Sequence, residues 1–277
     1  MVLTAEVVRD LNVMACRIRT DIVEMLNKSG SGHTGGSLSA ADLVTALYFH
    51  KMKHDPKNPS WDGRDRFILS KGHAAPLLYA ALARSGYFPT EELMTLRQLG
   101  SRLQGHPDSK KLPGVEISTG SLGQGLSIAC GMSLALRLDK KDCRVYALLG
   151  DGELQEGQVW EAAMTAAHFG LGNLTAIVDN NGLQIDGACK DVMCVDPIAD
   201  KFKAFGWDTI EIDGHDMTAI IDALDRATTK RDRPTAIVAR TIKGKGCSIF
   251  EGKAEYHGTA PSDEELKVAL QEIGGGK

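Results

Sequence analysis

Apolar residues recur along this chain in two patterns that predict helices and strands in alternation. Helical spacing in the first half predicts helices over 4–27, 37–50 and 74–85, with a short strand at 66–69. Continuous apolar runs in the second half predict strands at 145–149 and 174–178. Two further strands are expected at 207–212 and 235–239, and helices at 154–169 and 216–229. Strands that are apolar throughout and alternate with helices indicate a parallel sheet covered by helices on both faces.

The segments between these elements set the expected organisation of the domain. The glycine-rich stretch 29–36 predicts a tight loop, and 55–63 predicts a second loop. Because neither an internal repeat nor a low-complexity linker is present, we expect a single domain over 1–277. A closing helix is expected from 262 to 273, and a flexible tail over about 270–277.

Composition and charge exclude several classes of protein. Hydrophobic residues make up 43% of the chain and charged residues 25%, as in ordinary soluble proteins. With a formal net charge of -4 and no basic run, nucleic-acid binding is not expected. No apolar run is long enough to span a membrane. The six cysteines show no metal-ligand or C-x-x-C spacing, which favours free thiols in a reducing cytoplasm.

Polar residues follow two of the predicted strands at the point where each strand ends. Asp151 lies between two glycines after the strand at 145–149, and Asn181 follows the strand at 174–178. The interval between them matches the roughly 30 residues that strand, crossover helix and strand require. Since ligands bind outside the carboxyl ends of parallel strands, these side chains are expected to meet at one edge.

Carboxylate and amide oxygens at this edge suit a hard cation such as Mg²⁺ or Ca²⁺, which proteins often share with substrate phosphates. The glycines beside Asp151 allow close backbone approach, and the helix after Gly152 offers free N–H groups to an anion. A Gly-Asp-Gly segment alone more often forms an ordinary turn. The combination of spacing, edge and polar pair favours a metal and diphosphate site.

Several motifs, in the same order along the chain, resemble the N-terminal domain of transketolases. Gly150-Asp151-Gly152 followed by Asn181 is similar to the thiamine-diphosphate-binding signature of the wider superfamily. More specific segments accompany it over about residues 10–265: Ser31–His33, Asp65–His73, Gly105–Pro107, Leu112–Glu116, Thr119–Gly125, Gly150–Gly157 and Glu255–Gly258. The resemblance implies a thiamine-diphosphate-binding fold and transfer of a two-carbon ketol unit from a ketose phosphate to an aldose, as in the pentose phosphate pathway.

The resemblance also implies roles for individual residues. The metal, Mg²⁺ with Ca²⁺ or Mn²⁺ as alternatives, would be held by Asp151, Asn181 and the carbonyl of Leu183. The implied contacts to the cofactor come from His73 at the diphosphate, from Ile185 at the thiazolium, and from Gly120, Leu122, Gly152, Glu156 and His257. The implied catalytic histidines around the sugar are His33, His106 and His257, and the implied subunit interface contains Glu156 and Glu161.

A complete transketolase continues beyond the equivalent of Lys277 with a pyrimidine-binding domain, which carries the activating glutamate, and a C-terminal domain. The resemblance therefore implies the N-terminal subunit of a split enzyme, joined to a C-terminal subunit in an α2β2 heterotetramer. A truncated form of a full-length transketolase is the alternative. A specialised transketolase for an unusual sugar also stays open.

Other function classes fit the sequence less well. A deoxyxylulose-phosphate synthase or a 2-oxo acid dehydrogenase subunit would share the cofactor, but the segment 65–73 favours transketolase. A regulatory relic of the domain would have lost metal ligands or motif histidines, and all are present here. A dinucleotide-binding dehydrogenase would need G-x-G-x-x-G between a strand and a helix, whereas the glycines at 120–125 follow a loop.

Overall fold

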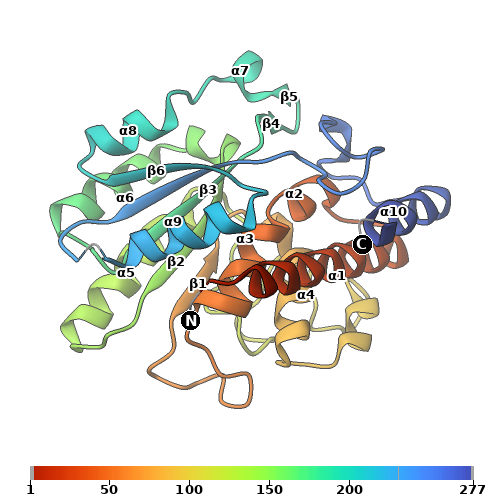
Figure 1. Cartoon of the computed structure of the whole chain (residues 1–277), viewed down its shortest axis with the longest axis horizontal. Helices are drawn as coiled ribbons and strands as arrows, with labels where there is room; N and C mark the ends of the chain where they lie inside the picture. The colour runs from red at the N-terminus through yellow and green to blue at the C-terminus, as the bar shows by residue number, and fades with distance from the viewer. Residues whose placement is uncertain (1–2, 230, 276–277) are drawn as a thin grey trace.

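A parallel five-stranded sheet forms the centre of the molecule. The computed structural model of the chain describes residues 3–229 and 231–275. The strands lie in the order β1 (Arg66–Leu69), β2 (Val145–Gly150), β3 (Leu174–Asn180), β7 (Thr235–Arg240) and β6 (Asp208–Asp213) (Figure 1). Every pair is parallel, from Arg66 opposite Val145 to Asp213 opposite Arg240. The predicted fold class and all the predicted strands are confirmed.

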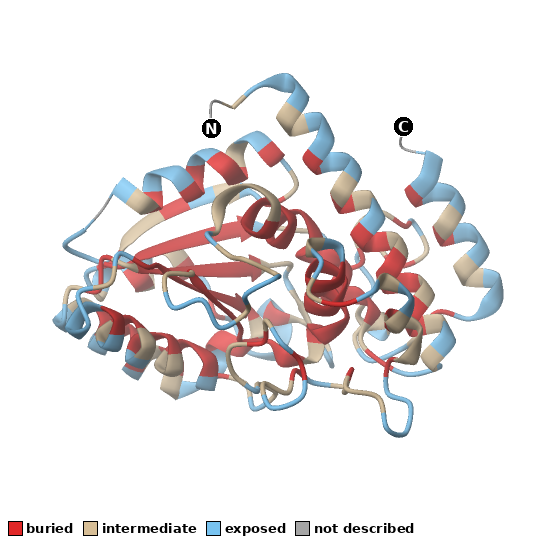
Figure 2. Cartoon of the chain, turned by 90° about the horizontal axis from the view of Figure 1, so that it is seen from below, coloured by how far each residue is buried: buried red, intermediate tan, exposed pale blue. Residues whose placement is uncertain are grey.

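Helices cover both faces of the sheet, which is why its inner strands β2, β3 and β7 are largely apolar. One face packs against α5 (Gln124–Leu138), α6 (Gly157–His168) and α8 (Ile198–Ala204). In β2, Val145, Ala147 and Leu149 face this layer, whereas Tyr146 and Leu148 face the other one. Four strands are accordingly buried between two helical layers, whereas the edge strand β6 is partly exposed (Figure 2).

The opposite face carries the larger core. It includes α3 (Ala41–Ala46), α4 (Ala75–Ser85) and α9 (Met217–Thr229). The long first helix, α1 (Ala5–Ser29), packs over α3 and α4, and the last helix, α10 (Asp263–Gly275), lies beside α1 (Figure 1). The ends of the described chain are therefore anchored to the same side of the sheet.

Short elements complete the architecture, mostly around the carboxyl edge of the sheet. A small hairpin, β4 (Leu183–Gln184) and β5 (Gly187–Ala188), follows β3 and leads into α7 (Cys189–Val192). The remaining short helical segments are α2 (Thr34–Ser39), η1 (Leu47–Lys51), η2 (Gly72–Ala74), η3 (Thr90–Thr95), η4 (Gly152–Gln155) and η5 (Ala254–Tyr256). Two of these segments, η2 and η4, form tight helical turns close to the ends of β1 and β2.

Two expectations for the first half of the chain are wrong in part. The tight loop predicted at 29–36 ends early, because α2 already begins at Thr34. Its glycines stay helical because the turn is buried: a Cβ at Gly35 would lie 2.8 Å from Cγ of Lys243. The single helix predicted at 37–50 is divided at Ala40 and ends in the π-helical η1. Tertiary packing decides both outcomes, against local propensity.

The end of the described chain is helical. Helix α10 reaches Gly275 and buries Ala269 and Ile273, so the tail expected at 270–277 overlaps its last turns. Residues 276–277 lie outside the described residues. Within the described part of the chain, no helix has the length and apolar character needed to cross a membrane. All six cysteines are free thiols, as expected.

Two glycines of α5 provide a matched test of the packing between this helix and β1. A Cβ at Gly125 would lie 2.3 Å from Oγ and 2.8 Å from Cα of Ser70, whereas a Cβ at Gly131 meets nothing within 4 Å. We expect Gly125→Ala to lower the free energy of unfolding by about 1–3 kcal/mol through overpacking. Gly131→Ala should raise it by up to about 1 kcal/mol through helix propensity. Urea denaturation of both variants measures the difference, and equal effects would contradict the described packing.

Candidate functional site

Candidate oxygen ligands lie together where β2 and β3 end, at the edge that the sequence predicts. One carboxylate oxygen of Asp151 accepts the N–H of Gly152 at 2.9 Å, and the other accepts the N–H of Gly182 at 2.6 Å. The side-chain oxygen of Asn181 accepts the N–H of Leu183 at 3.1 Å. The three expected ligands therefore lie on two neighbouring turns that are hydrogen-bonded to each other.

The site also contains two buried lysines and a buried aspartate. Lys71, after β1, forms an ion pair with Asp179 near the end of β3, and both side chains are almost fully buried. Lys243, after β7, donates to the carbonyl of Leu183 at 3.1 Å and to Nδ1 of His257 at 2.8 Å. Two cationic groups thus lie beside the candidate metal ligands.

Buried charges shift one another's pKa values in this region. Burial, and then the negative charge of Asp179, raises the pKa of Asp151 to about 6. Burial, and then the positive charge of Lys71, lowers the pKa of Lys243 to about 8. Burial alone would raise the pKa of Asp179, but the adjacent Lys71 outweighs it and holds that pKa below its usual value. Ionised Asp151 would be stabilised by a further cation.

A second buried carboxylate, Glu153, shapes the turn after β2. It accepts the backbone N–H groups of Gly123 at 2.9 Å and of Gly150 at 3.1 Å, and it also binds the hydroxyl of Ser70. These bonds tie the start of α5 to the ends of β1 and β2. Glu153 is fully engaged, which indicates a structural role in holding the glycine turns.

Four histidines from distant parts of the chain form one cluster. The ring of His33 lies 5.0 Å from that of His73, 5.5 Å from that of His257 and 6.4 Å from that of His106, centroid to centroid. The rings of His73 and His257 are 4.9 Å apart. Gly120 lies beside them, since a Cβ there would be 3.0 Å from the ring of His106.

Burial and nearby cations keep this cluster neutral. Burial, followed by the charge of Arg97, lowers the pKa of His33 to about 4. Burial, followed by Lys243, lowers that of His257 to about 3. The pKa values of His73 and His106 are lowered as well, chiefly by burial. Neutral imidazoles can accept as well as donate protons, which suits proton transfer near neutral pH.

The structure brings all the residues predicted for the site into one region. A pocket of about 180 Å³ is lined by nine of the twelve: His73, Leu122, Asp151, Gly152, Glu156, Asn181, Leu183, Ile185 and His257. The other three, His33, His106 and Gly120, adjoin it through the histidine cluster. Glu156 is exposed at its rim, and Glu161 is exposed on α6. The pocket is smaller than the roughly 300–1,000 Å³ of most ligand sites.

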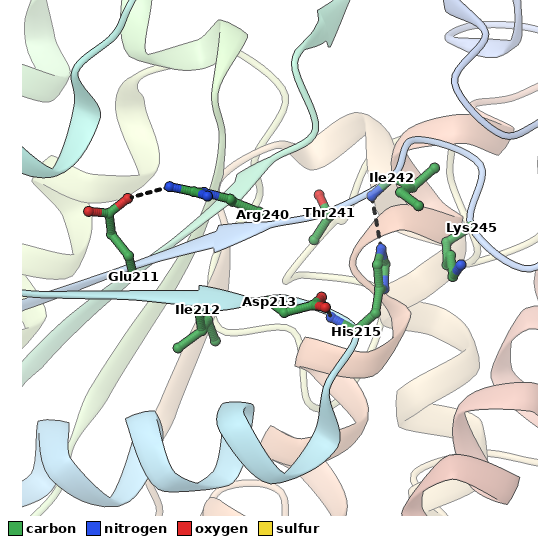
Figure 3. A pocket seen from close by; sticks show the side chains of 8 residues that line it. All are labelled: Glu211, Ile212, Asp213, His215, Arg240, Thr241, Ile242 and Lys245. Atoms are coloured by element: carbon green, nitrogen blue, oxygen red, sulfur yellow. Dashed lines mark hydrogen bonds and ion pairs between the residues drawn. The ribbon is translucent and has the colours of Figure 1, made fainter.

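A larger hollow, of about 670 Å³, lies where β6 and β7 end (Figure 3). Its polar groups are already paired. Arg240 contacts Glu211 at 3.3 Å, and the ring of His215 bonds to Asp42 and to the N–H of Ile242, each at 2.8 Å. None of the predicted site residues lines this hollow, and its groups are not left free for a ligand.

Three charged residues of the site, Lys71, Asp179 and Lys243, are not among those predicted from the sequence. Lys71 is part of a quoted motif, but only its neighbour His73 was selected. Asp179 directly follows the strand predicted at 174–178 but lies within the observed β3, where it is fully buried. Lys243 follows β7, so the rule that ligands lie at the carboxyl ends of strands would have found it. The motif around Lys71 and the strand-end position of Lys243 could have identified both lysines from the sequence. The ion pair of Asp179 with Lys71 is visible only in the structure.

Comparison with known proteins places this geometry in a family. The family described as transketolase, thiamine diphosphate binding domain, matches residues 11–276. The chain belongs to the transketolase family. It is 46% identical over 264 residues to a 6-deoxy-6-sulfo-D-fructose transketolase subunit of Clostridium sp. (strain MSTE9), covering 95% of this chain and 96% of that relative. It is 41% identical to an apulose-4-phosphate transketolase subunit of Phocaeicola vulgatus, covering 96% and 94%.

Larger transketolases match through only part of their length. The crystal structure of transketolase from Campylobacter jejuni superposes with a TM-score of 0.91 at 37% identity, covering 96% of this chain and 43% of that one. Transketolase-like protein 2 of Bos taurus is 44% identical, over 98% of this chain and 44% of its own length. The chain thus spans about two fifths of these full-length relatives.

The donor set fits a metal-bound diphosphate. Among the described residues, no group of three or more His, Cys, Asp and Glu side chains is arranged to hold a metal ion. The candidate site instead combines the buried Asp151 carboxylate with an amide and a carbonyl oxygen. Such an oxygen set suits Mg²⁺, which keeps other positions for phosphate and water. Lys71 and Lys243 supply positive charge beside it.

The lowered histidine pKa values predict acid-sensitive stability. The pKa of His33 falls from 6.5 to about 4 on folding, so between these pH values the unfolded chain binds more protons. Stability should be fully present above pH 6.5 and decline as the pH falls toward 4. His33→Asn should weaken this decline, while His168→Asn, at the exposed end of α6, serves as the control. Melting temperatures from pH 7.5 to 4 provide the measurement, and identical slopes in all three proteins would contradict the prediction.

Proposed function

We propose that this chain is the N-terminal subunit of a two-subunit transketolase, which transfers a two-carbon ketol unit from a ketose phosphate to an aldose with thiamine diphosphate. The observation that carries the proposal is the convergence of oxygen ligands, lysines and histidines at one edge of the sheet. The split relatives that match along their whole length support the same interpretation.

In this proposal Asp151, Asn181 and the carbonyl of Leu183 hold Mg²⁺, with Ca²⁺ or Mn²⁺ as alternatives. His73 binds the diphosphate, and the charges of Lys71 and Lys243 balance it. Hydrogen-bond donors and positive charge fixed before the ligand arrives stabilise an anion without further reorganisation. The donor chemistry and the buried carboxylate support these roles.

The remaining cofactor contacts in the proposal come from the turns around the pocket. Gly120 and Gly152 allow the backbone to approach the cofactor, and Leu122, Glu156 and Ile185 line its path. When bound, thiamine diphosphate supplies the carbanion chemistry of ketol transfer. Ile185 is 68% exposed in the single chain, which suits an apolar contact completed by a ligand.

His33, His106 and His257 are proposed to handle protons at the sugar. Lys243 donates to Nδ1 of His257, and the ring is neutral, so its proton lies on Nε2. His257 would therefore present an N–H donor. His33, with its lowered pKa, is free to accept a proton or a hydrogen bond at neutral pH.

The assembly is part of the proposal. We infer that the chain folds as one domain and joins a C-terminal subunit, carrying the pyrimidine-binding and C-terminal domains, in an α2β2 heterotetramer. The names of the split relatives and the small size of the pocket support a partner. Six free cysteines support a cytoplasmic location. A truncated form of a longer transketolase remains the alternative.

A specialised sugar is a specific second candidate for the substrate. The split relatives are named for 6-deoxy-6-sulfo-D-fructose and apulose 4-phosphate, at 46% and 41% identity. Transketolase of Mus musculus is 42% identical over 94% of this chain. These values do not separate the two substrate classes, so a panel of ketoses is required in the assay.

The first test removes the central metal ligand. In the enzyme assembled with its partner, Asp151→Ala should weaken Mg²⁺-dependent binding of thiamine diphosphate by more than about 100-fold, beyond the loss caused by removing an outer-shell partner. Asp186→Ala is the matched control, because Asp186 lines the same pocket but is exposed. Isothermal titration calorimetry measures both affinities. Unchanged affinity in Asp151→Ala would refute the metal assignment.

The second test concerns the partner. The purified chain alone should show no ketol transfer, because the activating glutamate of the family lies in a region that this chain does not match. Co-expression with the product of the neighbouring gene should restore turnover in the presence of thiamine diphosphate and Mg²⁺. Turnover by the chain alone would overturn the two-subunit proposal while leaving the transketolase assignment intact.

A further inference from the structure

Arg97 has an unusual backbone conformation beside the histidine cluster. It follows η3, and its backbone dihedral φ is 59°. This value lies in the left-handed region, which residues other than glycine rarely occupy. Its N–H donates to the carbonyl of Leu103 at 2.9 Å, which closes the loop that leads to His106. Such conformations concentrate at functional sites, where the surrounding structure maintains them.

The guanidinium group of Arg97 lies between the two loops that carry His33 and His106. It donates to the hydroxyl of Ser31 at 3.0 Å. A Cβ at Gly105 would lie only 2.9 Å from Cζ of Arg97, so the absence of a side chain there leaves room for the guanidinium. Arg97 therefore contacts both loops immediately before their histidines.

The positive charge of Arg97 is not neutralised by the protein. Among residues 3–229 and 231–275, no carboxylate forms an ion pair with it, and only one hydrogen bond of its side chain is found. The neighbouring cations differ, because Arg102 pairs with Glu92 at 2.5 Å and Lys111 lies 4.0 Å from Asp108. Arg97 thus retains donors for a ligand.

The same charge acts on the histidines. After burial, Arg97 is the main charged group that lowers the pKa of both His33 and His106. It also lines an exposed hollow of about 510 Å³ with Arg102 and Lys111. A cation on the border between the histidine cluster and a basic hollow is well placed for an anion that extends outward from the cluster.

We propose that Arg97 binds the terminal oxyanion, a phosphate or sulfonate, of the sugar whose ketol end lies among the histidines. The inference rests on the proposed function and deepens it, because it assigns part of the recognition of the charged sugar to this chain. A guanidinium group binds tetrahedral oxyanions through paired N–H donors, which a lysine cannot reproduce. Arg97 is accordingly a specificity-determining residue for charged over neutral sugars.

The test compares charged and neutral forms of one ketose with the assembled holoenzyme. Arg97→Gln should reduce kcat/KM for xylulose 5-phosphate by about 10–100-fold, the range expected for a lost charged hydrogen bond, mainly through KM. It should change kcat/KM for xylulose by less than about threefold. Arg97→Lys should fall between wild type and Arg97→Gln. Lys57→Gln, which removes an exposed cation from the loop before β1, outside this hollow and the candidate site, is the control and should leave both values unchanged.

Each other outcome has a definite meaning. Equal losses of kcat/KM on both sugars would show that Arg97 only holds the histidine loops. No loss on either sugar would show that Arg97 is not needed. Both results overturn the inference. Competitive inhibition by inorganic phosphate gives a second readout, since its Ki should rise at least about tenfold in Arg97→Gln, and an unchanged Ki also overturns it. A wild-type assembly that turns over no ketose of the panel would instead refute the proposed function. Melting temperatures of the variants verify folding.

Discussion

The buried ion pair between Lys71 and Asp179 holds the functional edge of the sheet together. Lys71 lies after β1 and Asp179 near the end of β3, so the pair bridges across β2. Asp179 also accepts bonds from Ser39 in α2, from Thr241 after β7 and from the amide of Asn181. Removing one partner of such a pair typically costs about 3–5 kcal/mol, because a charge is left buried and unpaired. Four separate segments therefore meet at Asp179: the end of β1, β3, α2 and the residue after β7.

The same ion pair sets the electrostatics of the candidate site. After burial, Asp179 is the main group that raises the pKa of Asp151, and Lys71 is the main group that lowers the pKa of Lys243. Asp151 and Lys243 are therefore each short of a partner of opposite charge. A divalent cation would provide one for Asp151, and a diphosphate would provide one for Lys243. The folded chain thus presents charges that are complementary to a metal-bound diphosphate and only partly satisfied by the protein.

The sequence predicts the sheet well, because burial on both faces leaves continuous apolar runs in β2, β3 and β7. It also predicts the positions of Asp151 and Asn181, since strand polarity fixes the edge at which they meet. It fails where packing overrides local preference. The glycines of α2 are helical because Lys243 and His73 lie against them, and Asp179 is tolerated in a core strand because Lys71 reaches it. Contacts between residues far apart in the chain are not visible in local patterns.

The pocket at the carboxyl edge of the sheet forms only one wall of a ligand site. At about 180 Å³ it is too small to enclose a typical ligand, and Ile185 at its rim remains 68% exposed. The polar groups, by contrast, are already fixed by hydrogen bonds to strand ends and turns. The charged end of a ligand could therefore be held by this chain, while its apolar part would remain in contact with water. Excluding that water requires a second surface, and the full-length relatives contain more than half of their sequence beyond the region matched here.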